Sequence, residues 1–233
     1  MQLRHDPVGG WSQLREMSGL LLKNALVKPP IYASNSNHAR MRLLPDASHE
    51  IKGILCQCIV DSNAGVRRVS SSIIASCTVG REAEGMEPLP LSEWGERILS
   101  PFLIHCLDSA IRIMEQDNGH GANGAAIMTD DIKYALMGSL QTLTKVLEDD
   151  ATKFERGSGA AFNRIVPCLI KLLKICGEER VKMDCLKCCV HMILVMPGSL
   201  IACMNDFLGV LSSLAGDSSM EVRKLVCRAI VTL

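Results

Sequence analysis

A short polar pattern occurs near both ends of the chain, each time between two apolar stretches of helical length. The first copy reads Asp-Ser-Asn-Ala-Gly-Val-Arg-Arg over residues 61–68, and the second reads Asp-Ser-Ser-Met-Glu-Val-Arg-Lys over residues 217–224. In both copies an Asp precedes a Val by five residues and an Arg by six. Self-similarity of this kind indicates an α-solenoid, in which helical hairpins stack and bury their apolar faces against one another.

A second pattern recurs between these two copies. It reads Pro-Phe-Leu-Ile-His-Cys-Leu from Pro101 and Pro-Cys-Leu-Ile-Lys-Leu-Leu from Pro167. Apolar residues precede both prolines, which favours a helix that is kinked at the proline; the alternative is a helix that begins there. A bent first helix is common in HEAT-type hairpins.

The composition supports an all-α fold and excludes several functions. Hydrophobic residues make up 48% of the 233 residues and aromatic residues only 3%, so aliphatic, Met and Cys side chains must do the packing. With 25 basic and 25 acidic residues, the net charge gives no case for nucleic-acid or membrane-surface binding. No apolar run reaches the ~18 residues of a membrane span.

The helical patterns group into hairpins of one HEAT-repeat solenoid that covers residues 1–233. A half hairpin comes first, and the last three full hairpins follow the HEAT period of about 40–47 residues, apart from one that an insertion lengthens. The half hairpin spans 10–27, and the full hairpins span 46–79, 92–149, 159–196 and 199–233. We expect residues 116–128, rich in Gly and Asn, to form a flexible insertion, and residues 153–158 to form a linker between two helices. Both terminal hairpins lack a polar cap, so we expect a fragment of a longer solenoid.

The repeated Asp and Arg residues are candidates for contacts between repeats. In HEAT proteins an Asp of one repeat and an Arg of the next form a ladder, and we expect Asp61, Arg67, Asp217 and Arg223 to contribute to it. The alternative is that all four are solvated charges. The third full hairpin has Cys176 where the Asp would fall, so we expect its rung to be incomplete.

The sequence shows no catalytic residues, no cofactor motif and no metal site. Cys185, Cys188, Cys189 and His191 lie close together, but no second ligand pair is spaced to complete a tetrahedral zinc site, so we interpret the three cysteines as buried packing residues. The 11 cysteines lack the spacing of a disulfide framework. An acidic run at residues 148–150 closes the fifth predicted helix, where it opposes the helix dipole; a basic partner would compensate that cost.

Three segments resemble the importin-beta-type nuclear transport receptors of the karyopherin-beta family. They are Ser-Gly-Leu-Leu-Leu-Lys-Asn at 18–24, Gly-Ser-Leu-Gln at 138–141 followed by Glu148-Asp149, and most specifically residues 211–233. Within the family they are most similar to the import receptors for Pro-Tyr-type nuclear localisation signals. The resemblance covers roughly residues 14–233 and corresponds to the second to sixth repeats. The insertion at 116–128 and the long connection at 80–91 depart from the family.

The resemblance implies a non-enzymatic nuclear import receptor that moves between cytoplasm and nucleus. In the family the N-terminal arch binds the GTP form of the small GTPase Ran through the second helices of its hairpins, and cargo signals bind elsewhere. The implied Ran contacts are Glu148 and Asp149, with Lys23 and Asn24 at the end of an earlier second helix. Other implied partners are cargo proteins, whose site lies outside this chain, and Phe-Gly nucleoporins. The alternatives are another importin or exportin, or a HEAT scaffold such as a phosphatase regulatory subunit.

Overall fold

The computed structural model describes residues 10–27, 45–78, 99–118 and 129–233, and these residues form an all-α structure of paired helices. The helices are α1 (Gly10–Val27), α2 (Pro45–Ile59), α3 (Ala64–Thr78), α5 (Ser100–Asn118), α6 (Asp130–Ile175), α7 (Glu179–Ile193), α8 (Gly198–Ala202), α9 (Met204–Leu214) and α10 (Met220–Thr232). The arrangement confirms the predicted solenoid of HEAT-type hairpins. Most of the expected insertion, residues 119–128, lies outside the described residues, as does the connection at 80–91.

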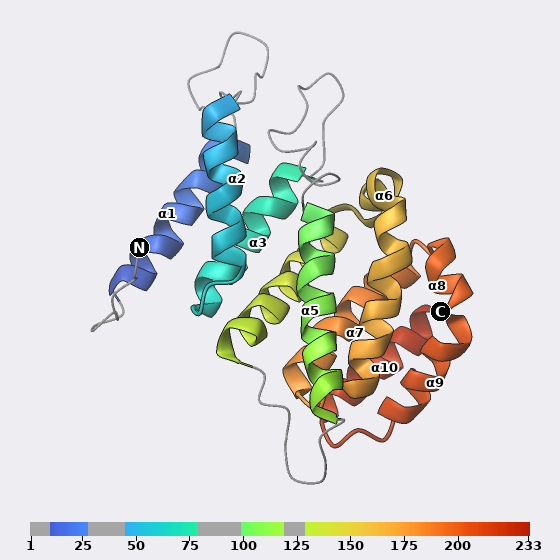
Figure 1. Cartoon of the computed structure of the whole chain (residues 1–233). Helices are drawn as coiled ribbons and strands as arrows, with labels where there is room; N and C mark the ends of the chain where they lie inside the picture. Colours follow the sequence, from blue (N-terminus) through green and yellow to red (C-terminus); the bar gives the residue numbers. More distant parts are fainter. Residues whose placement is uncertain (1–9, 28–44, 79–98, 119–128) are drawn as a thin grey trace.

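The helices form two layers (Figure 1). The inner layer contains α1, α3, the first part of α6, α7 and α10, each packed on the next. The outer layer contains α2, α5, the second part of α6 and α9. One continuous apolar core of aliphatic, Cys and Phe side chains runs between the layers from Leu55 to Ala229. This is the burial expected for a solenoid, where each hairpin contacts its neighbours along the stack.

Helix α6 differs from the prediction, because helical structure continues through the expected linker at 153–158. A straight helix would separate Phe154 from Phe162 by about 12 Å along its axis. Their ring centroids are only 5.4 Å apart, edge to face, and both rings are buried. The helix therefore bends between these two phenylalanines. One helix thus supplies the inner helix of one repeat and the outer helix of the next (Figure 1).

The two prolines have different outcomes. Pro167 lies inside α6 with its ring exposed, as expected for a proline within a helix. Pro101 lies in the first turn of α5, a position that tolerates a proline because the first backbone N–H groups of a helix have no intrahelical acceptor. The residues before Leu99 are outside the described part, so a kink at Pro101 stays a prediction.

Candidate functional site: the inner face and its neighbouring groove

The acidic pair Glu148 and Asp149 lies on the inner layer, within α6 and not at its end. Helical hydrogen bonding runs on to Ile175, so these carboxylates meet no exposed carbonyl groups of a helix C-terminus. The interpretation of an acidic run opposing a helix dipole is therefore wrong. Both side chains are exposed, which leaves them accessible to a partner.

Glu148 lies close to a lysine and a histidine of its own chain. Its Oε2 atom pairs with Lys145 Nζ one turn earlier, and its Oε1 atom lies 3.8 Å from His191 Nε2 of α7. Partial burial lowers the pKa of His191; Glu148 opposes this change, and Arg228 and Lys145 add to it. The imidazole is therefore neutral at pH 7, and Lys145 is the cation that Glu148 holds.

The positive charge of Lys23 acts on Asp149, although Lys23 belongs to α1 and Asp149 to α6. Partial burial raises the pKa of Asp149, and the positive charges of Lys23 and Lys145 counteract the rise. The Lys23 ammonium group donates a hydrogen bond to Ser72 Oγ of α3 at 2.6 Å. Lys23 therefore lies across the inner helices α1, α3 and α6, and the neighbouring Asn24 is exposed. The structure brings these predicted residues onto one surface of mixed charge.

The Asp residues of the two sequence patterns form equivalent contacts. Asp61 Oδ2 pairs with Arg15 of α1 at 2.5 Å, and Asp217 Oδ2 pairs with Lys182 of α7 at 2.7 Å. In each case the second carboxylate oxygen accepts the backbone N–H two residues later, at 2.8 and 2.9 Å. Each Asp thus orders its own turn and links it to the inner helix that precedes it.

Arg67 and Arg223 have different partners from those expected for the ladder. Each donates from Nη1 to two backbone carbonyl oxygens of its own turn; for Arg67 the distances are 2.6 and 2.8 Å, and for Arg223 they are 2.6 and 3.0 Å. Arg67 is almost fully buried, and its guanidinium lies 5.3 Å from the ring centroid of Tyr134. These arginines therefore stabilise the hairpin turn, because each guanidinium donates to carbonyl groups that have no helical partner.

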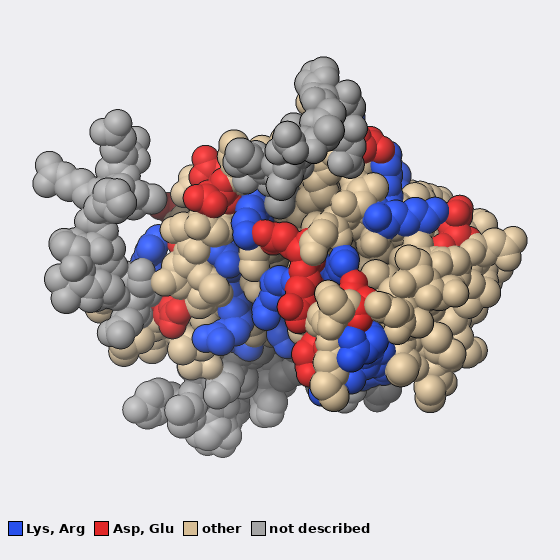
Figure 2. Space-filling view, turned by 90° about the horizontal axis from the view of Figure 1, so that it is seen from below, with Lys and Arg blue, Asp and Glu red and all other residues tan. Residues whose placement is uncertain are grey.

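The rung that was expected to be incomplete at Cys176 is present two residues later. Glu178 pairs with Lys133 of α6, in the same relation as Asp217 with Lys182. The sequence signal that would have identified it is a basic residue at the fourth position of each inner helix after α1: Arg67, Lys133, Lys182 and Arg223. Seen from below, positive and negative side chains alternate in a band across this face (Figure 2).

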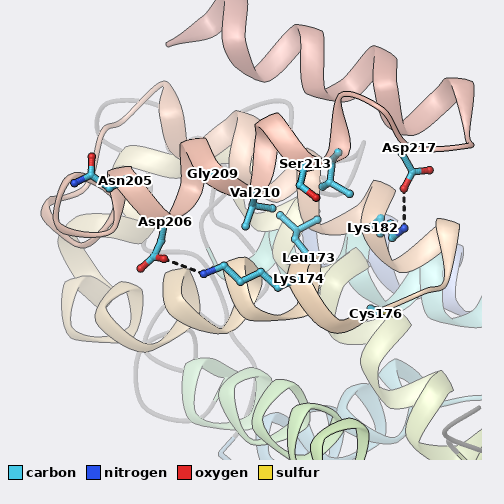
Figure 3. Close-up of a pocket in the computed structure, with 11 residues that line it drawn as sticks. Leu173, Lys174, Cys176, Lys182, Asn205, Asp206, Gly209, Val210, Ser213 and Asp217 are labelled. Atoms are coloured by element: carbon cyan, nitrogen blue, oxygen red, sulfur yellow. Dashed lines mark hydrogen bonds and ion pairs between the residues drawn. The ribbon is translucent and has the colours of Figure 1, made fainter. Parts of the chain in front are cut away.

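A groove of about 450 Å³ lies on the other side of this ladder, between the end of α6 and α9 (Figure 3). Its floor is apolar and consists of the buried Leu173, Val210 and Leu214. Gly209 opens one wall, since a Cβ atom there would meet nothing within 4 Å. Two ion pairs border the groove, Lys174 with Asp206 at 2.9 Å and Lys182 with Asp217. Sequence reasoning did not find this groove, because it arises where two repeats meet.

The cysteine cluster carries no evident chemistry. Cys185, Cys188 and Cys189 are buried in α7, and burial raises the pKa of all three thiols, that of Cys188 to about 12. Such thiols are protonated at neutral pH and are poor nucleophiles and metal ligands. Among the described residues no group of three or more His, Cys, Asp or Glu side chains could hold a metal ion. No helix in the described ranges has the length and apolar character to cross a membrane.

Comparison with known proteins shows homology to two nuclear transport proteins. The chain is 27% identical to transportin of Dictyostelium discoideum over 221 residues, which is 94% of this chain and 19% of that protein. It is 33% identical to importin subunit beta-2 of Schizosaccharomyces pombe over 98 residues, 41% of this chain and 11% of that protein. The chain spans about a fifth of the length of the transportin it matches. No family model matches the chain. The homology confirms the resemblance to nuclear transport receptors drawn from the sequence.

Proposed function

We propose that this chain, a homologue of transportin and of importin subunit beta-2, is part of a non-enzymatic nuclear import receptor and forms the arch that binds Ran in its GTP form. The homology extends over nearly the whole chain and supports the receptor class. The observation that carries the site is the exposed pair Glu148 and Asp149 on the inner layer, beside Lys23 of a distant repeat. The chain moves between cytoplasm and nucleus in this proposal, and cargo signals bind outside it.

The electrostatics of the site suit a transient and reversible partner. The exposed carboxylates of Glu148 and Asp149 already lie near the cations Lys145 and Lys23 of the same chain. A basic surface of Ran therefore replaces these intramolecular contacts with intermolecular ones. Exchange of solvated ion pairs contributes more to association rate and specificity than to affinity, and salt screens it. Binding of Ran at this arch and of cargo elsewhere on one flexible solenoid then couples negatively, which releases the cargo.

We place a weak contact with Phe-Gly nucleoporins in the groove between α6 and α9. Its apolar floor and open wall at Gly209 fit a large apolar side chain such as that of Phe. The groove is open to solvent, which suits contacts that form and break during passage through the pore.

The test of Ran binding is a titration of the full chain with Ran loaded with GTP and with GDP. We expect the GTP form to bind selectively. The double substitution Glu148→Lys and Asp149→Lys should weaken that binding at least tenfold, because it replaces two acceptors of the partner's cations with like charges.

The matched control reverses two exposed acids of the outer layer, Glu50 in α2 and Glu115 in α5, with the same change of net charge. This control should bind as the unsubstituted chain does. Equal weakening by both double variants would show a general charge effect and would contradict the assigned site. No selectivity for the GTP form in a folded chain would favour a HEAT scaffold, and selectivity with a different cargo class would favour another importin or exportin.

The groove is tested by measuring the binding of a Phe-Gly repeat peptide to the unsubstituted chain and to Gly209→Met. The Met side chain has room at its Cβ and would fill the groove, so we expect Gly209→Met to lose peptide binding. Gly53→Met is the control, because Gly53 of α2 is equally open but lies outside the groove. Unchanged peptide binding in Gly209→Met would contradict the proposed nucleoporin contact in this groove. It would not bear on the proposed Ran site.

A further inference from the structure

A buried carboxylate within α7 holds two cations that are themselves accessible to solvent. The Asp184 side chain is only 4% exposed, and each of its oxygen atoms accepts one hydrogen bond. Oδ1 accepts from Lys187 Nζ at 2.8 Å, and Oδ2 accepts from Arg180 Nε at 3.2 Å. By contrast, 53% of the Arg180 side chain and 35% of the Lys187 side chain are exposed. Because a buried carboxylate is costly unless it is paired, Asp184 fixes the positions of both cations.

The contact through Nε leaves the outer donors of Arg180 available to a partner. Among the described residues, no acceptor lies within hydrogen-bond distance of Nη1 or Nη2 of this guanidinium. These two groups form the planar fork that binds both oxygen atoms of a carboxylate at once. Lys187 donates to Asp184 with one of the three N–H groups of its ammonium. The pair therefore presents oriented donors to the solvent.

This cluster lies on a face of α7 that no neighbouring inner helix covers. The flanks of α7 pack against α6 on one side and α10 on the other. Arg180, Asp184, Lys187 and His191 follow the i, i+4, i+7, i+11 spacing of a single helix face. His191 lies 3.8 Å from Glu148, which places this face on the same inner surface as the acidic pair. The exposure of the cluster is therefore a property of the inner surface and does not come from a missing neighbour in the layer.

The charge of the cluster selects the kind of ligand. Two cations around one carboxylate give a net charge of one positive unit. Its influence extends to α3: burial lowers the pKa of Arg67, and the positive charge of Arg180 adds to this change, although Tyr134 and Asp61 oppose it. A single positive charge with an open guanidinium fork matches a carboxylate, whereas a phosphate monoester carries about 1.5 to 2 negative charges at pH 7. The chemistry favours Asp and Glu side chains of a protein.

We propose that the Arg180–Asp184–Lys187 cluster binds an acidic peptide segment of a partner protein. Arg180 takes one carboxylate of that segment in a bidentate contact, Lys187 takes a neighbouring one, and Asp184 is a positioning residue that does not touch the ligand. The site differs from the proposed Ran contact, where carboxylates of this chain meet a basic surface. Contacts between exposed charges are weakened by salt and serve specificity more than affinity.

The experiment is a fluorescence-anisotropy titration of labelled octaglutamate with the full chain. We expect binding that weakens as the salt concentration rises. The triple variant Arg180→Gln, Asp184→Asn and Lys187→Gln should weaken binding by roughly tenfold or more, because the bidentate donors are lost. It removes the buried charge together with both cations, so no carboxylate is left buried without a partner. Circular dichroism checks that the variant is folded.

The matched control changes a cluster of the same composition in the outer layer. There Arg164 pairs with Asp108, and Lys171 lies farther along α6. The triple variant Arg164→Gln, Asp108→Asn and Lys171→Gln has the same change of net charge and should bind octaglutamate as the unsubstituted chain does. No binding to the unsubstituted chain would overturn the proposal, and so would equal loss in both triple variants. Tighter binding of a peptide of the same length in which phosphoserine and glycine alternate would overturn the choice of carboxylates.

Discussion

At the scale of single residues, the turn between paired helices is the most strongly specified part of this protein. In both copies an Asp carboxylate accepts a backbone N–H of its own turn and pairs with a cation of the preceding inner helix. An Arg six residues after the Asp donates to the backbone carbonyls of the turn. Next to these groups, a polar residue caps the second helix: Asn63 Oδ1 accepts from Gly65 and Val66, and Ser219 Oγ from Val222.

Arg67→Ala should destabilise the chain by about 1–3 kcal/mol, because two carbonyl oxygens at a nearly buried position lose their donor. The neighbouring Arg68 is exposed, and Arg68→Ala should change the free energy of unfolding by less than about 0.5 kcal/mol. Urea denaturation of the two variants measures the difference. Equal effects would mean that the buried hydrogen bonds of Arg67 contribute nothing beyond its helix propensity.

The contribution of Asp217 to the free energy of unfolding should depend on pH. The hydrogen bond from Lys182 and the backbone bond from Ser219 hold the pKa of this carboxyl below its usual 3.8. A lowered pKa stabilises the folded state above about pH 4, and that stabilisation is lost as the pH falls through the folded-state pKa. The stability difference between the unsubstituted chain and Asp217→Asn should therefore be larger at pH 6 than at pH 3. A difference that stays constant between these pH values would contradict the assignment.

At the scale of helices, the close approach of layers decides which residues are tolerated. A Cβ atom at Gly138 of α6 would lie 1.7 Å from the carbonyl oxygen of Ile59, at the end of α2. Because the clashing atom belongs to the backbone, no rotation of a side chain can relieve the clash. The bend of α6 belongs to the same scale, because it brings Phe154 and Phe162 together and turns the helix from one layer to the other.

Gly138→Ala should therefore destabilise the chain by about 1–3 kcal/mol or more through overpacking. Gly53 lies within α2 with nothing within 4 Å of an added Cβ atom, so Gly53→Ala should stabilise by up to about 1 kcal/mol through helix propensity. Thermal melts of the two variants should shift in opposite directions. A stabilised Gly138→Ala would show that α2 and α6 can separate at no cost.

At the scale of the whole molecule, the solenoid should be most stable at its centre. Helices α6 and α7 pack against inner helices on both sides, while α1 and α10 pack on one side within this layer. In a linear array, local opening is easiest where an element has fewest neighbours. Hydrogen exchange at low protein concentration should accordingly be fast in α1 and α10 and slow in α6 and α7. Uniform protection would indicate a single cooperative unit.

Much of this architecture was predictable from residues that carry local signals. The repeated Asp-to-Arg pattern predicted stacked hairpins. Helix α1 has the bounds of the predicted half hairpin at 10–27, and α2 and α3 together span the hairpin predicted at 46–79 within one residue at each end. The linker at 153–158 was wrong because glycines mark a helix end and a helix bend alike, and only the contact of Phe154 with Phe162 distinguishes them. The residues of the candidate site were taken from the family resemblance, and their role stays a prediction. Nothing in the sequence indicated that Lys23 would lie near Asp149.

The sequence by itself determined the class of fold, the hairpin turns and the family resemblance, because turn capping and helical periodicity act within a few residues. The partners of the charged groups were decided only by the tertiary structure. The pairing of Glu178 with Lys133, the field of Lys23 at Asp149 and the groove between α6 and α9 all join residues of different repeats. Such contacts depend on how far each hairpin is rotated and shifted on its neighbour, and that geometry is set by the packing of the shared core.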